Sequence, residues 1–237
     1  MNLKTSSRNS KVEPHKFIGG RMSASTMVES LRDKKTWLRA MGYLKKRDSL
    51  MKDIINVQGY IKIPIHGNHY GALIRSIIAQ QISGSAAISI TNRLRAVFGG
   101  RFPAPDEFLT TDKRKIFRAG VSPQKFSYIK DLSERIVDGR VELRKFNRLP
   151  NDRIIEELDE VRGIGRWTAE MFMMFSLGRT DILPMDDYGI RKAIKRKYRL
   201  RELPDKKKLA IFERRWSPYN SIASIYLWED EGIKEPK

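Results

Sequence analysis

The sequence predicts an all-α protein of roughly ten helices joined by short connections. Apolar residues recur at intervals of three and four along most of the chain, which is the spacing of a helix face. Glycine and proline stand at the boundaries of these segments, where they start or stop helices. The single strand-like stretch, residues 60–65, alternates apolar and polar residues but contains a proline. A chain of 237 residues fits one large domain or two small lobes with a core of its own.

The first part of the chain divides into an arm and a series of helical segments. Residues 1–25 hold few large apolar side chains, so we expect a flexible basic arm ahead of a helical region at 26–237. Helical spacing begins near Met27 and continues past Met51. The clearest helix follows Asn68 and ends at the Ser-Gly-Ser break of residues 83–85. Its predicted buried stripe is Tyr70, Leu73, Ile74, Ile77, Ile78, Gln81 and Ile82.

The later helices are bounded by recognisable caps. Ser122 followed by Pro123 supplies a capping hydroxyl and a proline suited to the first helical turn. The pair Gly99-Gly100 supplies the left-handed backbone that a helix end favours. Beyond residue 85 the predicted helices are 86–98, 105–109, 113–118, 123–138, 151–162, 167–176, 187–198, 203–216 and 218–228.

The charge of the chain points to a polyanionic partner. Lys and Arg number 47 against 28 Asp and Glu, a formal charge of +19, which favours nucleic acid over the main alternative, a membrane surface. No apolar run is long enough to span a membrane or to serve as a signal core, so we expect an intracellular protein without membrane association. The chain contains no cysteine and three histidines, which excludes thiolate chemistry and iron–sulfur clusters. We therefore expect neither a metal site nor a cofactor.

A candidate DNA-binding turn lies between two of the predicted helices. Gly163 and Gly165 let the backbone turn tightly and let a phosphate approach the amides that open the second helix. Arg162 and Arg166 add positive charge beside the turn, and Ile164 is expected to plug down between the helices. Such a turn grips a DNA backbone without reading its sequence. The alternative is an ordinary helix–helix turn.

The same segment resembles a known family. Val161–Ala169, followed by Leu183–Tyr188, is similar to the helix-hairpin-helix DNA glycosylases, and most of all to their 3-methyladenine-DNA glycosylase II branch. Further motifs in the family's order fall at 77–83, 120–125 and 216–228, so the likeness spans roughly residues 44–228. The resemblance implies a two-lobed helical fold with a DNA-binding cleft between the lobes and the hairpin at 158–176. It implies DNA contacts from Arg162, Gly163, Ile164, Gly165, Arg166 and Thr168.

The resemblance also assigns the chemistry. Cleavage of an N-glycosidic bond passes through an oxocarbenium-like sugar, which needs a fixed anion and a positioned water. The family's catalytic carboxylate corresponds to Asp187, for which the alternative is a simple helix cap, and the two roles are compatible. Asp186 is expected to be a solvated neighbour. The bifunctional members carry their Schiff-base lysine at the position of Trp167, so tryptophan here implies a water nucleophile and no strand cleavage.

The flipped base needs a pocket and the duplex needs a wedge. Trp167, Tyr188 and Trp216 are the candidate pocket aromatics, on which a cationic alkylated purine stacks well; core packing is the alternative for each. Trp228 and Tyr226 are expected to be core residues. Gln81 or Ser83 is the candidate wedge. The alternative for Gln80 and Gln81 is a hydrogen-bonded amide in the core, which is favoured for Gln80. One departure is Asn220, where relatives commonly carry arginine, and it puts in doubt any salt bridge there.

Together these features predict a monomeric, monofunctional glycosylase that removes alkylated purines, of the 3-methyladenine and 7-methylguanine type, from double-stranded DNA in base excision repair. Two alternatives remain. One is a glycosylase for deaminated or other neutral lesions on the same scaffold. The other is a helix-hairpin-helix DNA-binding protein without catalysis, which would have no use for Asp187.

Overall fold

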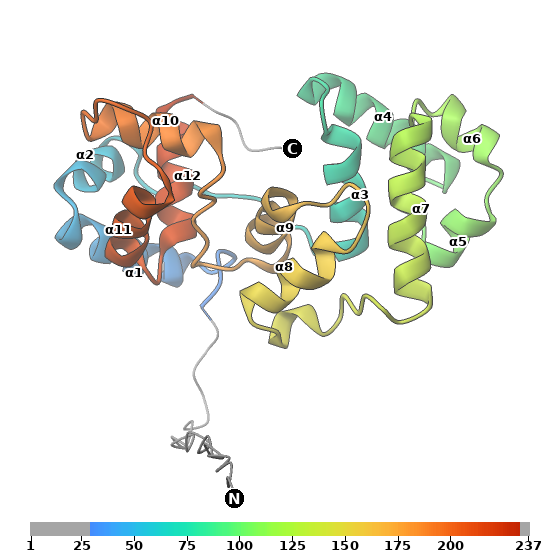
Figure 1. Cartoon of the computed structure of the whole chain (residues 1–237), viewed down its shortest axis with the longest axis horizontal. Coiled ribbons are helices and arrows are strands. Elements are labelled where there is room, and N and C mark those ends of the chain that lie inside the picture. The colour runs from blue at the N-terminus through green and yellow to red at the C-terminus, as the bar shows by residue number, and fades with distance from the viewer. Residues whose placement is uncertain (1–28, 233–237) are drawn as a thin grey trace, which may run out of the picture.

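Helices account for the regular structure of residues 29–232, the part of the chain that the computed structural model describes (Figure 1). No strand occurs within those residues, so the all-α prediction is confirmed. The predicted basic arm at 1–25 lies outside the described residues. In chain order the α-helices are α1 (Lys34–Arg47), α2 (Ser49–Gln58), α3 (His69–Ala79), α4 (Gly84–Val97), α5 (Pro105–Thr110), α6 (Lys113–Arg118), α7 (Pro123–Val137), α8 (Asn151–Asp159), α9 (Arg166–Phe172), α10 (Tyr188–Lys197), α11 (Lys206–Trp216) and α12 (Asn220–Asp230). A 3₁₀ turn, η1 (Phe146–Arg148), precedes α8, and a π-helical segment, η2 (Met173–Leu177), extends α9.

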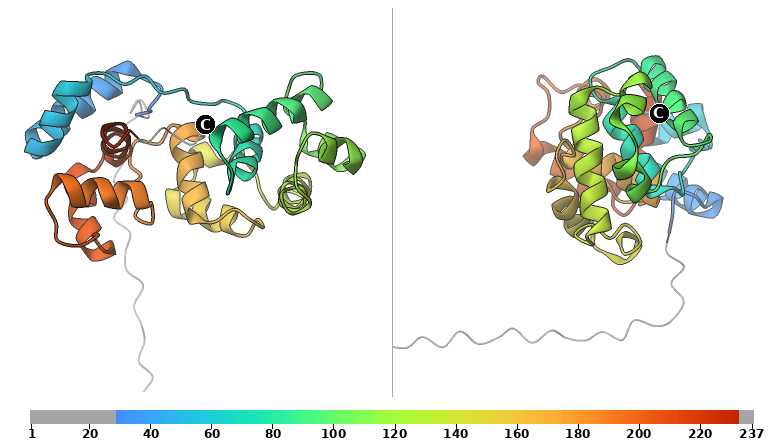
Figure 2. Two further views of the ribbon diagram at one scale, coloured as in Figure 1. Left: turned by 90° about the horizontal axis from the view of Figure 1, so that it is seen from above. Right: turned by 90° about the vertical axis from the view of Figure 1, so that its right-hand side faces the viewer.

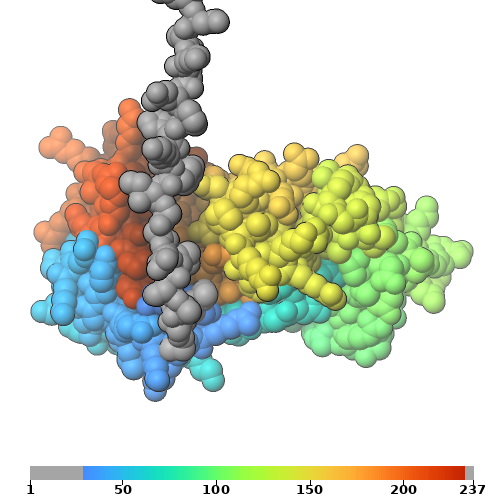
Figure 3. Space-filling model, turned by 90° about the horizontal axis from the view of Figure 1, so that it is seen from below, coloured from blue at the N-terminus to red at the C-terminus, as the bar shows by residue number. Residues whose placement is uncertain are grey.

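The helices pack as two lobes. The terminal lobe consists of α1, α2 and α10–α12, in which α12 packs against each of the other four. The central lobe consists of α3–α9, in which α3 packs against α4, α7 and α9. Figure 1 shows the terminal lobe on the left and the central lobe on the right, and the view from below in Figure 3 separates them in the same way. Both ends of the described chain therefore belong to one lobe, and the middle of the chain forms the other.

Two extended segments join the lobes. Residues 59–68 lead from α2 to α3, and residues 178–187 lead back from η2 to α10 (Figure 2). The predicted strand at 60–65 is wrong, because this segment pairs with no neighbouring strand; its alternation instead places Ile63 in the core. His66 donates its backbone N–H to the carbonyl of Phe175 in η2 at 3.0 Å. This hydrogen bond fixes the connection 59–68 to the segment that extends α9.

Polar side chains set helix boundaries, of which the one at Ser122 was predicted and the one at Asp48 was not. Ser122 accepts a hydrogen bond from the backbone of Lys125 at the start of α7. Asp48 separates α1 from α2, and its buried carboxylate caps α2. The same carboxylate accepts hydrogen bonds from the Tyr198 hydroxyl at 2.6 Å and the Trp216 indole at 3.0 Å. Asp48 thereby ties three helices of the terminal lobe together, which keeps α10 in a fixed position.

Within residues 29–232 no helix combines the length and the apolar character needed to cross a bilayer.

Candidate active site

Asp187 lies where the second connection between the lobes enters α10. Its backbone is extended at the N-cap position, and Oδ1 accepts the backbone N–H of Ile190 at 2.8 Å. Oδ1 also accepts the indole N–H of Trp228 at 3.1 Å, and Oδ2 accepts the indole N–H of Trp167 at 2.9 Å. Three N–H groups from three helices therefore hold one half-buried carboxylate. The cap and the proposed catalytic position coincide in this residue.

A cavity of about 800 Å³ opens beside Trp167. Its walls come from both lobes: the connection Ile61–Pro64, one face of α3, the α9–η2 segment, and Glu229 at the end of α12. Trp167, Met171 and Phe175 follow one another at four-residue intervals along a single wall. Trp167 is 37% exposed, so part of its ring faces the cavity while its N–H holds Asp187. The cavity is wide enough for a purine. Asp187 is not one of its lining residues, and its carboxylate is linked to the cavity through the hydrogen bond from Trp167.

The predicted pocket aromatics are only partly brought together. Trp167 lines the cavity, whereas Tyr188 projects from the surface with 66% of its side chain exposed and does not line it. The prediction for Trp216 is wrong, because its ring is fully buried and its N–H is used by Asp48. A side chain without exposed surface offers no face to a base. The prediction for Trp216 failed because large aromatic side chains more often pack in the core of a protein than line a binding site.

Several residues around the cavity and around Asp187 could not be assigned from the sequence. Trp228 is buried as predicted, but besides packing at 6.2 Å from the ring of Phe175 it donates to Asp187. Met171 and Phe175 were recognisable in principle, because they continue the helix face that Trp167 begins. Pairing between an indole and a carboxylate 41 residues earlier leaves no trace in local spacing. His66 lines the cavity from the inter-lobe connection, and burial lowers the pKa of its imidazole, as does the neighbouring Arg75.

The hairpin joins α8 to α9 and has the predicted form. Gly163 has a left-handed backbone with φ of +76°, and a Cβ placed there would lie 2.2 Å from the ring of Tyr128. Ile164 is 2% exposed, so it plugs the turn as predicted. Gly165, by contrast, faces open space, and it begins α9 without a side-chain cap. The first amides of α9 are therefore unobstructed beside an approaching anion.

The charged side chains of the hairpin are exposed. Arg162 and Arg166 both reach solvent, and the backbone N–H of Arg162 donates to Asp131 of α7 at 2.9 Å. Thr168, the remaining predicted DNA contact, is 6% exposed and so offers the least surface of the set. Arg166 forms an ion pair at 3.0 Å with Glu170, a buried carboxylate one turn further along α9. Burial outweighs this pairing and raises the pKa of Glu170 to about 7.

The turn after α3 stands against the hairpin. Gln80 donates from Nε2 to the carbonyl of Gly163 at 2.6 Å, so its amide is hydrogen-bonded as predicted, although the side chain is only half-buried and does not belong to the core. Gln81 is exposed, lines the cavity and adopts a left-handed backbone with φ of 56°. Ser83 caps α4 by accepting the N–H of Ala86, so its hydroxyl already has a structural partner. Gln81 is the better placed of the two predicted wedge residues.

Asn220 has a structural role in place of a salt bridge. Its side chain is buried at the start of α12, and Nδ2 donates to Asp181 at 2.6 Å. Ser217 donates to the second oxygen of Asp181 at 2.7 Å. These bonds fasten the second inter-lobe connection to α12. Among the described residues, no group of three or more His, Cys, Asp or Glu side chains is arranged to hold a metal ion.

Comparison with known proteins places this geometry in a family. Residues 74–218, more than half of the chain, match the model of the helix-hairpin-helix GPD superfamily of base excision DNA repair proteins. The chain belongs to this superfamily. It is 35% identical over 168 residues to DNA-3-methyladenine glycosylase 1 of Schizosaccharomyces pombe, covering 70% of this chain and 74% of that one. It is 33% identical to a putative DNA-3-methyladenine glycosylase of Bacillus subtilis, across 67% of this chain and 58% of the relative.

Solved structures of superfamily members share the two-lobed fold. The 3-methyladenine DNA glycosylase of S. pombe in complex with abasic DNA superposes with a TM-score of 0.73 at 30% identity, covering 83% of this chain and 98% of that one. The DNA-3-methyladenine glycosidase of Bacillus halodurans gives 0.74 at 34% identity, covering 86% and 91%. A Clostridium acetobutylicum 8-oxoguanine glycosylase/lyase gives 0.70 at 20% identity, covering 88% and 75%, so it shares the fold alone. The predicted family and fold are thus confirmed.

Proposed function

We propose that this protein is a monofunctional DNA glycosylase that removes alkylated purines from double-stranded DNA by hydrolysis of the N-glycosidic bond. The observation that carries the proposal is the carboxylate of Asp187, which is held by the indole of Trp228 and by the indole of Trp167, a residue that lines the cavity. The relatives named as 3-methyladenine glycosylases support the same substrate class.

Asp187 supplies the fixed anion of the reaction. A base alkylated at N3 or N7 carries positive charge, so it departs as a neutral molecule without a general acid. The sugar left behind develops oxocarbenium character, which a carboxylate close to C1′ stabilises. The same carboxylate orients the water that attacks C1′. Because its two oxygens are each fixed by N–H donors, it needs little reorganisation as charge develops.

The cavity receives the flipped base. The exposed part of the Trp167 ring stacks on the alkylated purine, and its electron-rich face favours a cation. Glu229, at the end of α12, lines the cavity with one negative charge, while Lys62 and Arg75 line it with positive charges. Gln81 fills the gap left in the duplex, at the tip of the turn that Gln80 fastens to the hairpin. A neutral lesion gains less from the face of Trp167 than a cationic purine does.

The hairpin holds the DNA backbone. Gly163 and Gly165 expose the amides at the start of α9, while Arg162 and Arg166 neutralise the neighbouring phosphates. These contacts are independent of sequence, as a search for rare lesions requires. The protein binds one lesion per monomer, since both lobes that form the cavity belong to the same chain.

Water, not an amine, is the nucleophile. The position at which bifunctional family members carry a lysine holds Trp167, which has no amine with which to form a Schiff base. The product is therefore an intact strand with an abasic site.

Incubation with methylated duplex DNA tests the proposal. We expect release of 3-methyladenine and 7-methylguanine, with the strands intact when they are analysed without heat or alkali. Strand breaks formed in step with base release would contradict the monofunctional mechanism. Release of hypoxanthine from an inosine-containing duplex at a rate equal to that of methylated purines would contradict the preference for cationic bases. Duplex binding with no release of any base would contradict the glycosylase activity and would support DNA binding by the hairpin without catalysis.

A further inference from the structure

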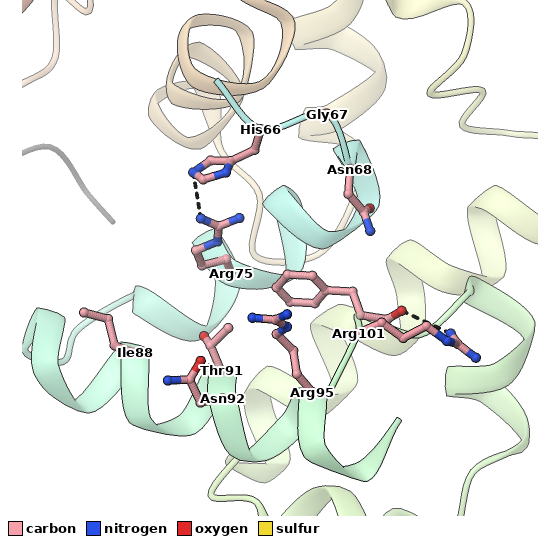
Figure 4. A pocket seen from close by; sticks show the side chains of 10 residues that line it. His66, Gly67, Asn68, Arg75, Ile88, Thr91, Asn92, Arg95 and Arg101 are labelled. Atoms are coloured by element: carbon pink, nitrogen blue, oxygen red, sulfur yellow. Dashed lines mark hydrogen bonds between the residues drawn. The ribbon is translucent and has the colours of Figure 1, made fainter. Parts of the chain in front are cut away.

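A second cavity, of about 550 Å³, lies between the N-terminal part of α3 and the exposed face of α4. It is lined by Asn68, Arg75, Ile88, Thr91, Asn92 and Arg95 among others, and Figure 4 shows these side chains around it. His66 and Arg75 also line the first cavity, so the two hollows adjoin. The site of base excision makes no use of α4 beyond the turn at its beginning.

Two of the three arginines that line this cavity have no acidic partner among residues 29–232. Arg101 is neutralised by Glu107, with two hydrogen bonds of 2.6 and 2.5 Å. Arg75 and Arg95 have no carboxylate partner among residues 29–232; Arg75 instead donates to the ring of His66 at 2.8 Å. Both guanidinium groups lie over the ring of Phe102, at 5.8 and 5.7 Å from its centre.

The two guanidinium groups are close enough to repel each other. Burial and the charge of Arg95 both lower the pKa of Arg75. Arg95 lies in the last turn of α4, where the helix carbonyls partly offset its charge. Two like charges held together on one aromatic ring, without a counter-ion, form an arrangement that an anion stabilises.

Thr91 supplies the second, independent observation. Its side chain is 93% buried, yet its hydroxyl has no hydrogen-bond partner among the described residues. A threonine inside a helix ordinarily donates to a carbonyl one turn earlier, which leaves no buried group unsatisfied. Thr91 instead lines this cavity with Asn92 and Arg95 of the same helix. A hydroxyl donor beside two guanidinium groups is a set of donors suited to phosphate oxygens.

We propose that the cavity between α3 and α4 binds a phosphate group, which contacts Arg75, Arg95 and the hydroxyl of Thr91. The phosphate comes either from the DNA strand that leaves the neighbouring base-excision cavity or from a small phosphate-containing molecule. The site uses none of the groups that hold Asp187, so it is independent of the chemistry proposed above.

Binding of inorganic phosphate to the full chain tests the site. Calorimetry at constant ionic strength, with chloride as the balancing anion, should detect binding, and amide resonances of residues 88–95 should shift. R95Q and T91V should each weaken phosphate binding on the order of tenfold, since each removes one donor to a charged oxygen. R144Q is the matched control for charge, because Arg144 is exposed and has no side-chain partner among the described residues; it should bind phosphate as the wild type does.

The T91V variant also separates a loss of phosphate binding from a loss of folding. Valine has the shape of threonine without the unsatisfied hydroxyl, so in phosphate-free buffer T91V should melt at or above the wild-type temperature. A loss of phosphate binding in a variant of undiminished stability is specific to the site. Equal phosphate affinity in R95Q, T91V and R144Q, together with equal duplex affinity in all three, would overturn the proposal.

Duplex DNA that carries an uncleavable abasic-site analogue distinguishes the two sources of phosphate. A strand phosphate predicts that R95Q lowers duplex affinity more than R144Q does and reduces the salt dependence by about one phosphate contact. A small phosphate-containing molecule predicts equal duplex affinity for the two variants with phosphate binding lost only in R95Q. Base release from methylated DNA is measured separately, so failure of the glycosylase proposal and failure of this site give different results.

Discussion

The indole of Trp167 has two separable contributions, and substitution by phenylalanine removes one of them. Phenylalanine keeps an aromatic face toward the cavity but loses the N–H that holds Oδ2 of Asp187 at 2.9 Å. A hydrogen bond to a charged group contributes about 1.5–3 kcal/mol. The lower end applies here, because the ring is 37% exposed and Oδ1 keeps its own two donors. A loss of about 1.5 kcal/mol in the transition state corresponds to a rate about tenfold lower.

Substitution by leucine removes both contributions. Base–aromatic stacking accounts for about 1–3 kcal/mol per base, so Trp167→Leu should reduce excision by roughly a further tenfold beyond Trp167→Phe. The assay is single-turnover release of 7-methylguanine from methylated duplex, with thermal melting as the check that both variants fold. Wild-type excision by Trp167→Phe would refute the positioning of Asp187 by this indole. Equal rates for the two variants would refute stacking.

Other parts of the structure give predictions of their own. Asp48→Asn should lower the free energy of unfolding by about 2–3 kcal/mol in urea titration, because the Tyr198 hydroxyl and its neighbours lose a buried anion; an unchanged midpoint would contradict this. Gly163→Ala should destabilise the protein by about 1–3 kcal/mol, given its φ of +76° and the ring 2.2 Å from a Cβ, whereas Gly165→Ala should keep the wild-type stability and weaken duplex binding. Glu170 has its pKa raised from 4.5 to about 7, so the folded state retains a proton that the unfolded state releases, and stability falls as pH rises from about 4.5 to about 7. The loss is about 3 kcal/mol, and it should be smaller in Glu170→Gln when unfolding is measured at pH 5 and pH 8; parallel curves for the two proteins would count against it.

Much of the fold was predictable because its boundaries are local. The pair Ser122-Pro123 acts on the next few residues, so the sequence alone shows where α7 begins. The helix predicted from residue 86 begins at Gly84, because Ser83 is its cap. The strand predicted at 60–65 failed for the opposite reason. Alternating apolar residues are typical of a strand, but here residues 61–64 all line the cavity between the lobes, and Ile63 is also buried in the core.

The site was predictable only in part, for a related reason. A motif indicated Asp187 and the hairpin, but which tryptophan faces the cavity depends on packing between distant segments. Trp216 and Trp228 both occur in the last motif, and both are buried. One donates to Asp48 and the other to Asp187, a difference set by the packing of α11 against α1 and of α12 against α10.

Base release by Asp187→Asn tests the central claim most directly. Asparagine still accepts the N–H of Ile190 and is itself a favourable cap, so α10 and the fold should persist. Loss of the anion should reduce release of 7-methylguanine at least about a hundredfold, while affinity for a duplex with an abasic-site analogue stays within about twofold of wild type. Release at the wild-type rate would contradict the assignment of Asp187 as the catalytic carboxylate.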